Sequence, residues 1–192
     1  IPGVAKISKL TSKRNDKEVI TQNQKYKTNN EILDLLKYRF KLSNPIERIE
    51  AYDNSFFGNN YAVASYVVFN NDGISMKESR TYKFKDFDLK KFGDADLMRK
   101  VFESRFSKDD KLLPDIIIID GGIPYLKMCQ EILRKNGIKE NILLIGVTKG
   151  FKRDFRFDSY HTLQNKNISL KDSPKIEGFI QKLRDKAVSY TH

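Results

Sequence analysis

The stretch PDIIIIDGG, residues 114–122, decides how this chain folds. Its four consecutive isoleucines predict a strand buried on both faces, which in a mixed sheet is typical of a central parallel strand. The two glycines then give a tight turn, and Pro124 suits the first turn of a helix over residues 123–135. Asp120 is therefore expected at the carboxyl end of a central strand, where open α/β sheets form their sites.

Upstream of this strand the pattern is that of an antiparallel meander. Three β-rich runs cover residues 46–55, 61–70 and 77–85. Gly58-Asn59-Asn60 separates the first two, and Asn71-Asp72-Gly73, an Asn/Asp-Gly hairpin signal, precedes the third. We therefore expect three antiparallel strands joined by short turns.

Helical and strand patterns alternate in the rest of the chain. Apolar residues recur at helical spacing in residues 31–41 and 95–106, and a last helix follows Ser173-Pro174. NILLIGVTKG, residues 141–150, is a second buried strand. The order βββαβαβ plus a terminal helix predicts an α/β domain with the RNase H-like fold, a mixed sheet flanked by helices, over residues 31–192. Residues 1–30 are polar and aperiodic and are expected to form a linker or extended arm.

The charge balance favours a polyanionic partner. Lys and Arg number 36 against 25 Asp and Glu, a net charge of +11, which suits nucleic acid or a membrane surface. No run approaches the roughly 20 apolar residues of a membrane span, and no export signal is visible. The single cysteine, Cys129, fits a reducing cytoplasm and a place in the core. We expect the chain to be part of a longer polypeptide.

Two acids are placed to share one site. In the expected topology the first strand lies beside the 116–120 strand, so Asp53 and Asp120 can converge. Adjacent carboxylates repel unless a cation joins them, and Mg²⁺ or Mn²⁺ between them is the usual solution for phosphodiester hydrolysis. The alternative is that Asp120 caps the following helix and Asp53 is an acid at a strand end.

A basic, aromatic segment follows the second buried strand. Lys149, Lys152, Arg153 and Arg156 alternate with phenylalanines in TKGFKRDFRF, residues 148–157, a mix expected of a ribbon that contacts DNA phosphates. A solvated hairpin edge is the competing interpretation. A histidine such as His161 is more often structural than catalytic.

Several stretches in the right order resemble blocks of the UvrC C-terminal endonuclease domain, the incision part of bacterial nucleotide excision repair. They are RIEAYDNS (48–55), YAVASYVVF (61–69), PDIIIIDGG (114–122), LLIGVTKG (143–150) and QKLRDKA (181–187), preceded by SKRNDKEVITQNQ (12–24). The resemblance implies metal-binding catalytic roles for Asp53 and Asp120, and a third acid at Asp94, with Asp96 as the alternative. It implies a bacterial, cytoplasmic endonuclease that cuts DNA 5′ to a lesion with a UvrB-type partner, and a monomeric isolated domain.

The chain departs from the family at three places. Phe56 stands where the family's first motif has histidine, GGIPY (121–125) replaces a Gly-Gly-Lys-Gly-Gln turn, and Val188 stands at the family's catalytic histidine. His192 lies one helical turn beyond Val188. These departures leave a second hypothesis open, a DNA-binding module that has lost its chemistry. A third is another RNase H-like nuclease, such as a relative of endonuclease V.

Overall fold

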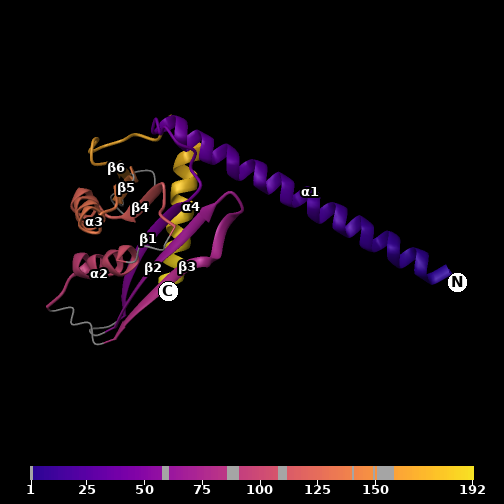
Figure 1. Cartoon of the computed structure of the whole chain (residues 1–192), viewed down its shortest axis with the longest axis horizontal. Helices are drawn as coiled ribbons and strands as arrows, with labels where there is room; N and C mark the ends of the chain where they lie inside the picture. The colour runs from indigo at the N-terminus through magenta and orange to yellow at the C-terminus, as the bar shows by residue number, and fades with distance from the viewer. Residues whose placement is uncertain are drawn as a thin grey trace.

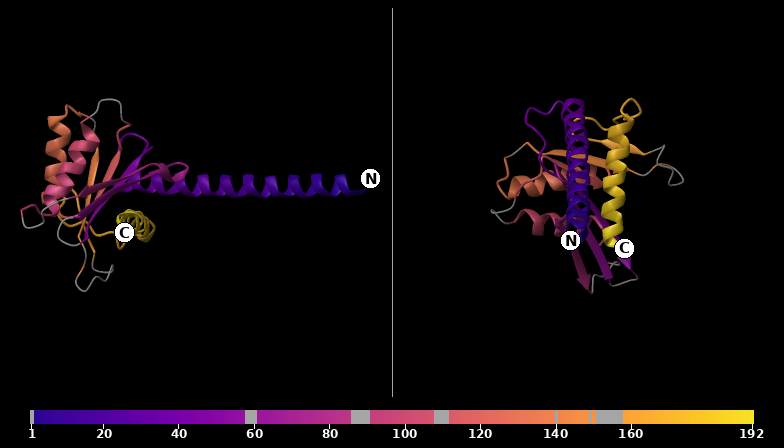
Figure 2. Two further views of the ribbon diagram at one scale, coloured as in Figure 1. Left: turned by 90° about the horizontal axis from the view of Figure 1, so that it is seen from below. Right: turned by 90° about the vertical axis from the view of Figure 1, so that its right-hand side faces the viewer.

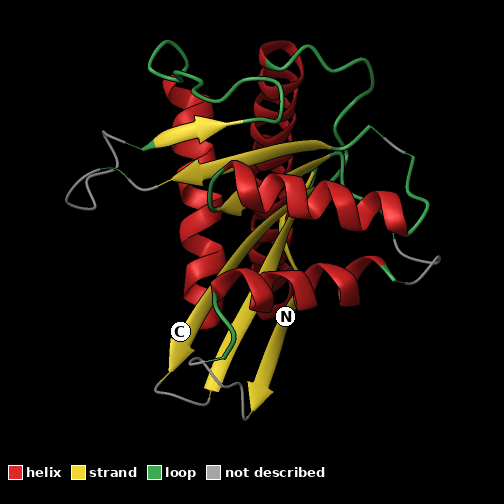
Figure 3. Ribbon diagram, turned by 90° about the vertical axis from the view of Figure 1, so that its left-hand side faces the viewer, coloured by secondary structure: helices red, strands yellow, loops and turns green. Residues whose placement is uncertain are grey.

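The computed structural model describes residues 2–57, 61–85, 91–107, 112–139, 141–148, 150 and 158–192, with side chains of the first helix from residue 18 onward. A six-stranded mixed sheet forms the centre, with helices on both faces (Figures 1 and 3). The elements are α1 (Pro2–Arg39), β1 (Ile49–Phe57), β2 (Tyr61–Asn70), β3 (Gly73–Lys85), α2 (Asp94–Phe106), β4 (Ile116–Asp120), α3 (Ile123–Lys135), β5 (Leu143–Thr148), β6 (Ser159–His161) and α4 (Pro174–Thr191).

The strand order is β3-β2-β1-β4-β5-β6. β1, β2 and β3 form the predicted antiparallel meander, while β4 pairs with β1 and with β5 in parallel. β6 then closes the edge antiparallel to β5. This order confirms the RNase H-like α/β fold, and it places the isoleucine-rich β4 at the centre, as its unbroken apolar run predicted.

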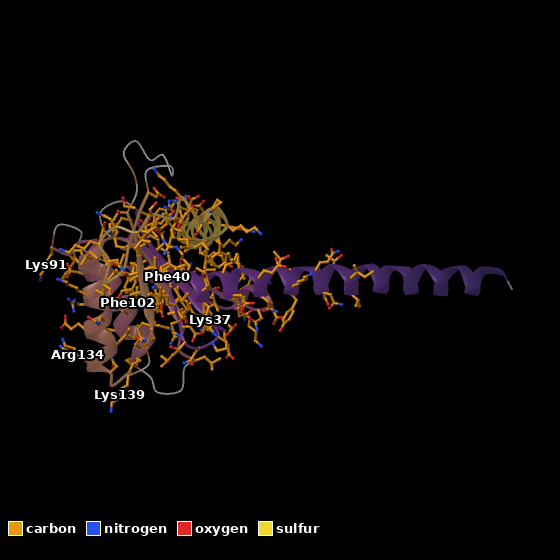
Figure 4. The ribbon with its side chains drawn as sticks, turned by 90° about the horizontal axis from the view of Figure 1, so that it is seen from above. Lys37, Phe40, Lys91, Phe102, Arg134 and Lys139 are labelled. Atoms are coloured by element: carbon orange, nitrogen blue, oxygen red, sulfur yellow. The ribbon has the colours of Figure 1, made fainter. Side chains whose placement is uncertain are left out.

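Two apolar cores lie on the two faces of the sheet. Alternate residues of β4 point to opposite sides, so Ile117 and Ile119 meet α2 and α3, whereas Ile116 and Ile118 meet α1 and α4. Figure 2 shows the same layers, with α2 and α3 on one side and α4 on the other. Of the residues labelled in Figure 4, Phe102 lies within the body, while Arg134 and Lys139 lie at its edge.

Helix α1 is much longer than the sequence predicted. A helix was expected only over residues 31–41, yet one continuous helix runs from Pro2 to Arg39 and projects away from the body (Figures 1 and 2). Residues 1–30 are therefore helical from Pro2 and do not form an extended arm; a role as a linker stays a prediction. Among the side chains described from residue 18 onward, Asn29, Leu33 and Leu36 are buried and residues 18–28 are exposed. An apolar period cannot predict a helical stretch such as 18–28, whose side chains are all exposed.

The other boundaries differ less. β3 begins at Gly73, four residues before the predicted start at 77, and Gly73 has a φ of 101°, as a hairpin turn of this kind requires. None of the helices in the described part of the chain is both long enough and apolar enough to cross a membrane.

Candidate active site

Asp53 and Asp120 lie side by side on the two central strands, β1 and β4, at the carboxyl edge where β4 ends. The parallel pairing of β1 with β4 runs from Ile49 opposite Ile116 to Tyr52 opposite Ile119, so the next position along each strand holds Asp53 and Asp120. Neighbouring strands are about 4.8 Å apart, and residues in register on them point to the same face. Both carboxylates therefore occupy neighbouring positions on the face that α4 covers.

The end of α4 makes a direct contact with the first of these acids. The Thr191 hydroxyl donates to Asp53 Oδ2 at 2.8 Å, and both residues are buried, at 3% and 5% exposure. Ser65, opposite Asp53 on β2, donates to the Ala187 carbonyl at 2.9 Å. These bonds fix the C-terminal half of α4 over the site and orient the Asp53 carboxylate.

A buried cation stands beside the second acid. Arg184 of α4 forms a 2.6 Å ion pair with Asp158, whose side chain is 2% exposed. Burial opposes the charged guanidinium, but the hydrogen bond to Asp158 and the charges of Asp158, Asp185 and Asp120 outweigh it and raise the pKa of Arg184. Arg184 is thus within electrostatic reach of Asp120, and it offsets part of the negative charge there.

Asp94 approaches the same edge from α2. It is the first residue of that helix, and its backbone carbonyl accepts a 3.2 Å hydrogen bond from the Asn54 side chain, next to Asp53 in β1. Burial, and then the charges of Asp94 and Asp120, raise the pKa of Tyr125, so both acids lie near that phenol. Asp96, the alternative candidate, accepts instead from the Gly93 backbone N–H at 2.9 Å and caps the helix.

The turn after Asp120 depends on glycines. A Cβ built on Gly146 of β5 would meet the Gly121 carbonyl oxygen at 2.5 Å, and one on Gly121 would meet the Tyr125 ring at 2.8 Å. The Gly121 N–H donates to the Val147 carbonyl at 2.8 Å. The strand can therefore turn into α3 directly behind Asp120 without displacing β5.

The site offers two carboxylates to a metal ion. Within the part of the chain that the structure describes, no three or more His, Cys, Asp or Glu side chains gather so as to hold a metal. Mg²⁺, however, commonly binds through one or two carboxylates and completes its shell with water and substrate phosphates. The pair Asp53 and Asp120, with the Thr191 hydroxyl beside them, fits a site of that kind.

Each of the two histidines contacts a threonine hydroxyl. His192 Nδ1 lies within 3.2 Å of Thr191 Oγ1 and 3.1 Å of the Val188 carbonyl. His161 Nε2 lies 2.8 Å from the Thr148 hydroxyl at the end of β5. Val188, at the position of the family histidine, is half-buried on α4.

Cys129 is buried among apolar side chains, as expected, and burial raises the pKa of its thiol.

The predicted DNA-binding residues Lys149, Lys152, Arg153 and Arg156 lie outside the described residues, so their role stays a prediction. Two contacts were missed by sequence reasoning, those of Arg184 and Thr191. The LRDKA block carried the only signal for Arg184, because it marked that helix as part of the resemblance. No pattern marked Thr191, because its role follows from the way α4 crosses the sheet.

Comparison with known proteins identifies the family of this chain. The sequence model of the UvrC RNase H endonuclease domain matches residues 37–191. The chain belongs to this family.

Relatives of the domain include UvrABC system protein C from Ruegeria pomeroyi, 32% identical over 168 residues, and from Rhodospirillum rubrum, 31% identical over 156 residues. These alignments cover 83% and 77% of the chain but 27% and 24% of the relatives. The chain thus spans about a quarter of the proteins it matches.

Solved structures similar to this UvrC endonuclease domain include endonuclease V from Ciona intestinalis bound to inosine-containing DNA. That structure is 20% identical, with a TM-score of 0.38. The alignment covers 70% of this chain and 59% of the Ciona chain. Endonuclease V from Bacillus subtilis is 17% identical, with a TM-score of 0.37. The alignment covers 62% of this chain and 56% of the Bacillus chain.

Proposed function

We propose that this UvrC endonuclease domain is a metal-dependent DNA endonuclease that hydrolyses a phosphodiester 5′ to a lesion, within a longer bacterial protein that works with a UvrB-type partner. One observation carries the proposal: Asp53, in the middle of β1, and Asp120, the last residue of β4, occupy adjacent in-register positions on two central parallel strands. The surplus of basic residues, +11 overall, supports a DNA partner.

Each side chain has a separate role in such a site. Asp53 and Asp120 would hold Mg²⁺ or Mn²⁺, which when bound supplies an activated water and charge stabilisation for the leaving 3′-oxygen. Thr191 holds one oxygen of Asp53 and so fixes the orientation of that carboxylate. Arg184 limits the repulsion between the acids before DNA arrives, because its charge lies near Asp120. Asp94 is the third acid proposed to act here.

Incision assays on nicked and bubble DNA with Mn²⁺ test this function. We expect cleavage by the unaltered chain and a loss of at least about 100-fold in Asp53→Asn, with DNA affinity retained, because the change removes a charge that only the reaction needs. Asp172→Asn is the matched control, since that side chain is 71% exposed and lies before the start of α4. A chain that never cleaves, or that cleaves equally well as Asp53→Asn, is not this nuclease.

A second candidate function is favoured by Val188, which cannot transfer a proton or bind a metal. In that case the domain would bind DNA through its basic surface without cutting it. Salt-sensitive DNA binding together with absent cleavage, and no change on Asp53→Asn, would identify this function.

A further inference from the structure

A groove of about 580 Å³ lies between α1, α4 and the turn that joins β2 to β3. Its floor is apolar, and Leu35, one of the residues that line it, is 38% exposed. The floor consists of Ile32, Leu35, Phe69, Ile74, Phe179 and Leu183. Apolar surface gathered in one concave place on an otherwise highly charged protein marks an interaction site. We call it the α1–α4 groove.

The rim of the α1–α4 groove is basic. Lys25 of α1 and Lys175 and Lys182 of α4 line it, and all three are exposed. Glu31 is the single acidic side chain among the lining residues that the structure describes. Three positive charges against one negative charge therefore surround an apolar floor.

The groove is held in shape from below. Asn29 of α1 donates to the Asn71 carbonyl in the β2–β3 turn at 2.9 Å, and the rings of Phe69 and Phe179 pack edge to face at 4.8 Å. Gly178 leaves its wall open, since a Cβ placed there would meet no atom within 4 Å. A ligand can thus approach the α4 backbone without rearranging the floor.

The chemistry of the groove selects among possible occupants. DNA would pair with the lysines but gains nothing from a floor of isoleucine, leucine and phenylalanine. A second copy of this chain carries the same excess of positive charge, +11, and would be repelled by the rim. An amphipathic helix with apolar side chains at i, i+3, i+4 and i+7 and flanking carboxylates satisfies both floor and rim.

We propose that the α1–α4 groove is a docking site for an acidic amphipathic helix of a partner protein. The groove reaches Leu183 of α4, and Thr191, which contacts Asp53, lies eight residues further along the same helix. At 1.5 Å per residue this is about 12 Å. A docked helix would therefore sit near the carboxylate pair.

A fluorescein-labelled peptide with leucines at i, i+3, i+4 and i+7 and glutamates beside them tests the proposal by anisotropy. We expect micromolar binding, weakened about 10-fold by Lys182→Glu and by Leu35→Glu, and no binding of the same peptide with lysines in place of glutamates. Lys77→Glu, an exposed change on β3 outside the groove, is the matched control and should alter affinity less than about twofold.

Thermal melts establish that each variant folds, and Lys175→Glu replaces Lys182→Glu if that one does not. The proposal fails if the acidic peptide does not bind, if both groove variants bind it normally, or if the basic peptide binds equally well. It also fails if duplex DNA displaces the peptide to the same extent as the DNA itself binds, since DNA would then occupy the groove. Sedimentation that shows a dimer whose interface blocks the groove would equally overturn it.

Discussion

At the scale of single residues, the site depends on groups that carry no chemistry. Gly146 of β5 leaves room for the Gly121 carbonyl, which directly follows Asp120. A side chain at position 146 would have to displace backbone, because the atom it meets is a carbonyl oxygen and not the end of a flexible side chain. The small residue is what allows β4 to turn into α3 directly after Asp120.

Gly146→Ala is therefore expected to lower the free energy of unfolding by about 2 kcal/mol, in line with overpacking of a filled core. Urea denaturation measures this. Gly178→Ala is the matched control, since that glycine is exposed within α4 and its added methyl meets nothing, so the change should stabilise the helix by about 0.5 kcal/mol or more. Equal effects of the two changes would contradict the close packing of Gly146 against Gly121.

At the scale of elements, α4 matters most, since it closes one face of the sheet and supplies Thr191 and Arg184. Arg184→Met should cost about 3 kcal/mol, because it leaves the Asp158 carboxylate buried without its cation. Asp185→Asn removes the exposed partner of the same arginine, 70% accessible, and should cost less than about 0.5 kcal/mol. Chemical denaturation of both variants decides this, and a small loss for Arg184→Met would mean that the buried pair does not hold α4.

The sequence predicted some elements far better than others, for physical reasons. The meander and β4 were predictable because alternation and an unbroken isoleucine run are local signals. The Asp53 and Asp120 juxtaposition followed from strand order alone. The length of α1 was not predictable, because its first 30 residues bury almost nothing among those described, and the Thr191 contact depends on how a helix crosses a sheet. Long-range packing leaves no periodic trace in the chain.

At the scale of the whole molecule, buried phenols make stability depend on alkaline pH. Burial, and then the Glu50 charge, raise the pKa of Tyr52. Burial, with the charges of Glu177 and Asp158, also raises the pKa of Tyr160 to about 12, although the hydrogen bond from Gln181 opposes this shift. The unfolded chain loses these protons near pH 10, before the folded chain does. Their stabilisation is complete below pH 10 and is lost as the pH rises toward 12.

Unfolding free energy should accordingly fall between pH 10 and 12, and Tyr160→Phe should remove up to about 2 kcal/mol of that fall. Denaturation curves at pH 8, 10 and 11.5 measure the slope. The variant also loses the contacts of the Tyr160 hydroxyl with Glu177 and Gln181. This loss lowers stability at pH 8 as much as at the higher pH values, so it does not change the slope. An unchanged slope in the variant would contradict a protonated, buried Tyr160.

The claim that Asp53 and Asp120 hold one cation together is tested most directly by Mn²⁺ binding, followed by electron paramagnetic resonance on the unaltered chain, Asp53→Asn, Asp120→Asn and the double variant. We predict that either single change removes most of the tight binding and that the double variant is no weaker than the singles, because both side chains serve the same ion. If each single variant keeps full affinity, or if the two losses simply add, the acids do not share a site.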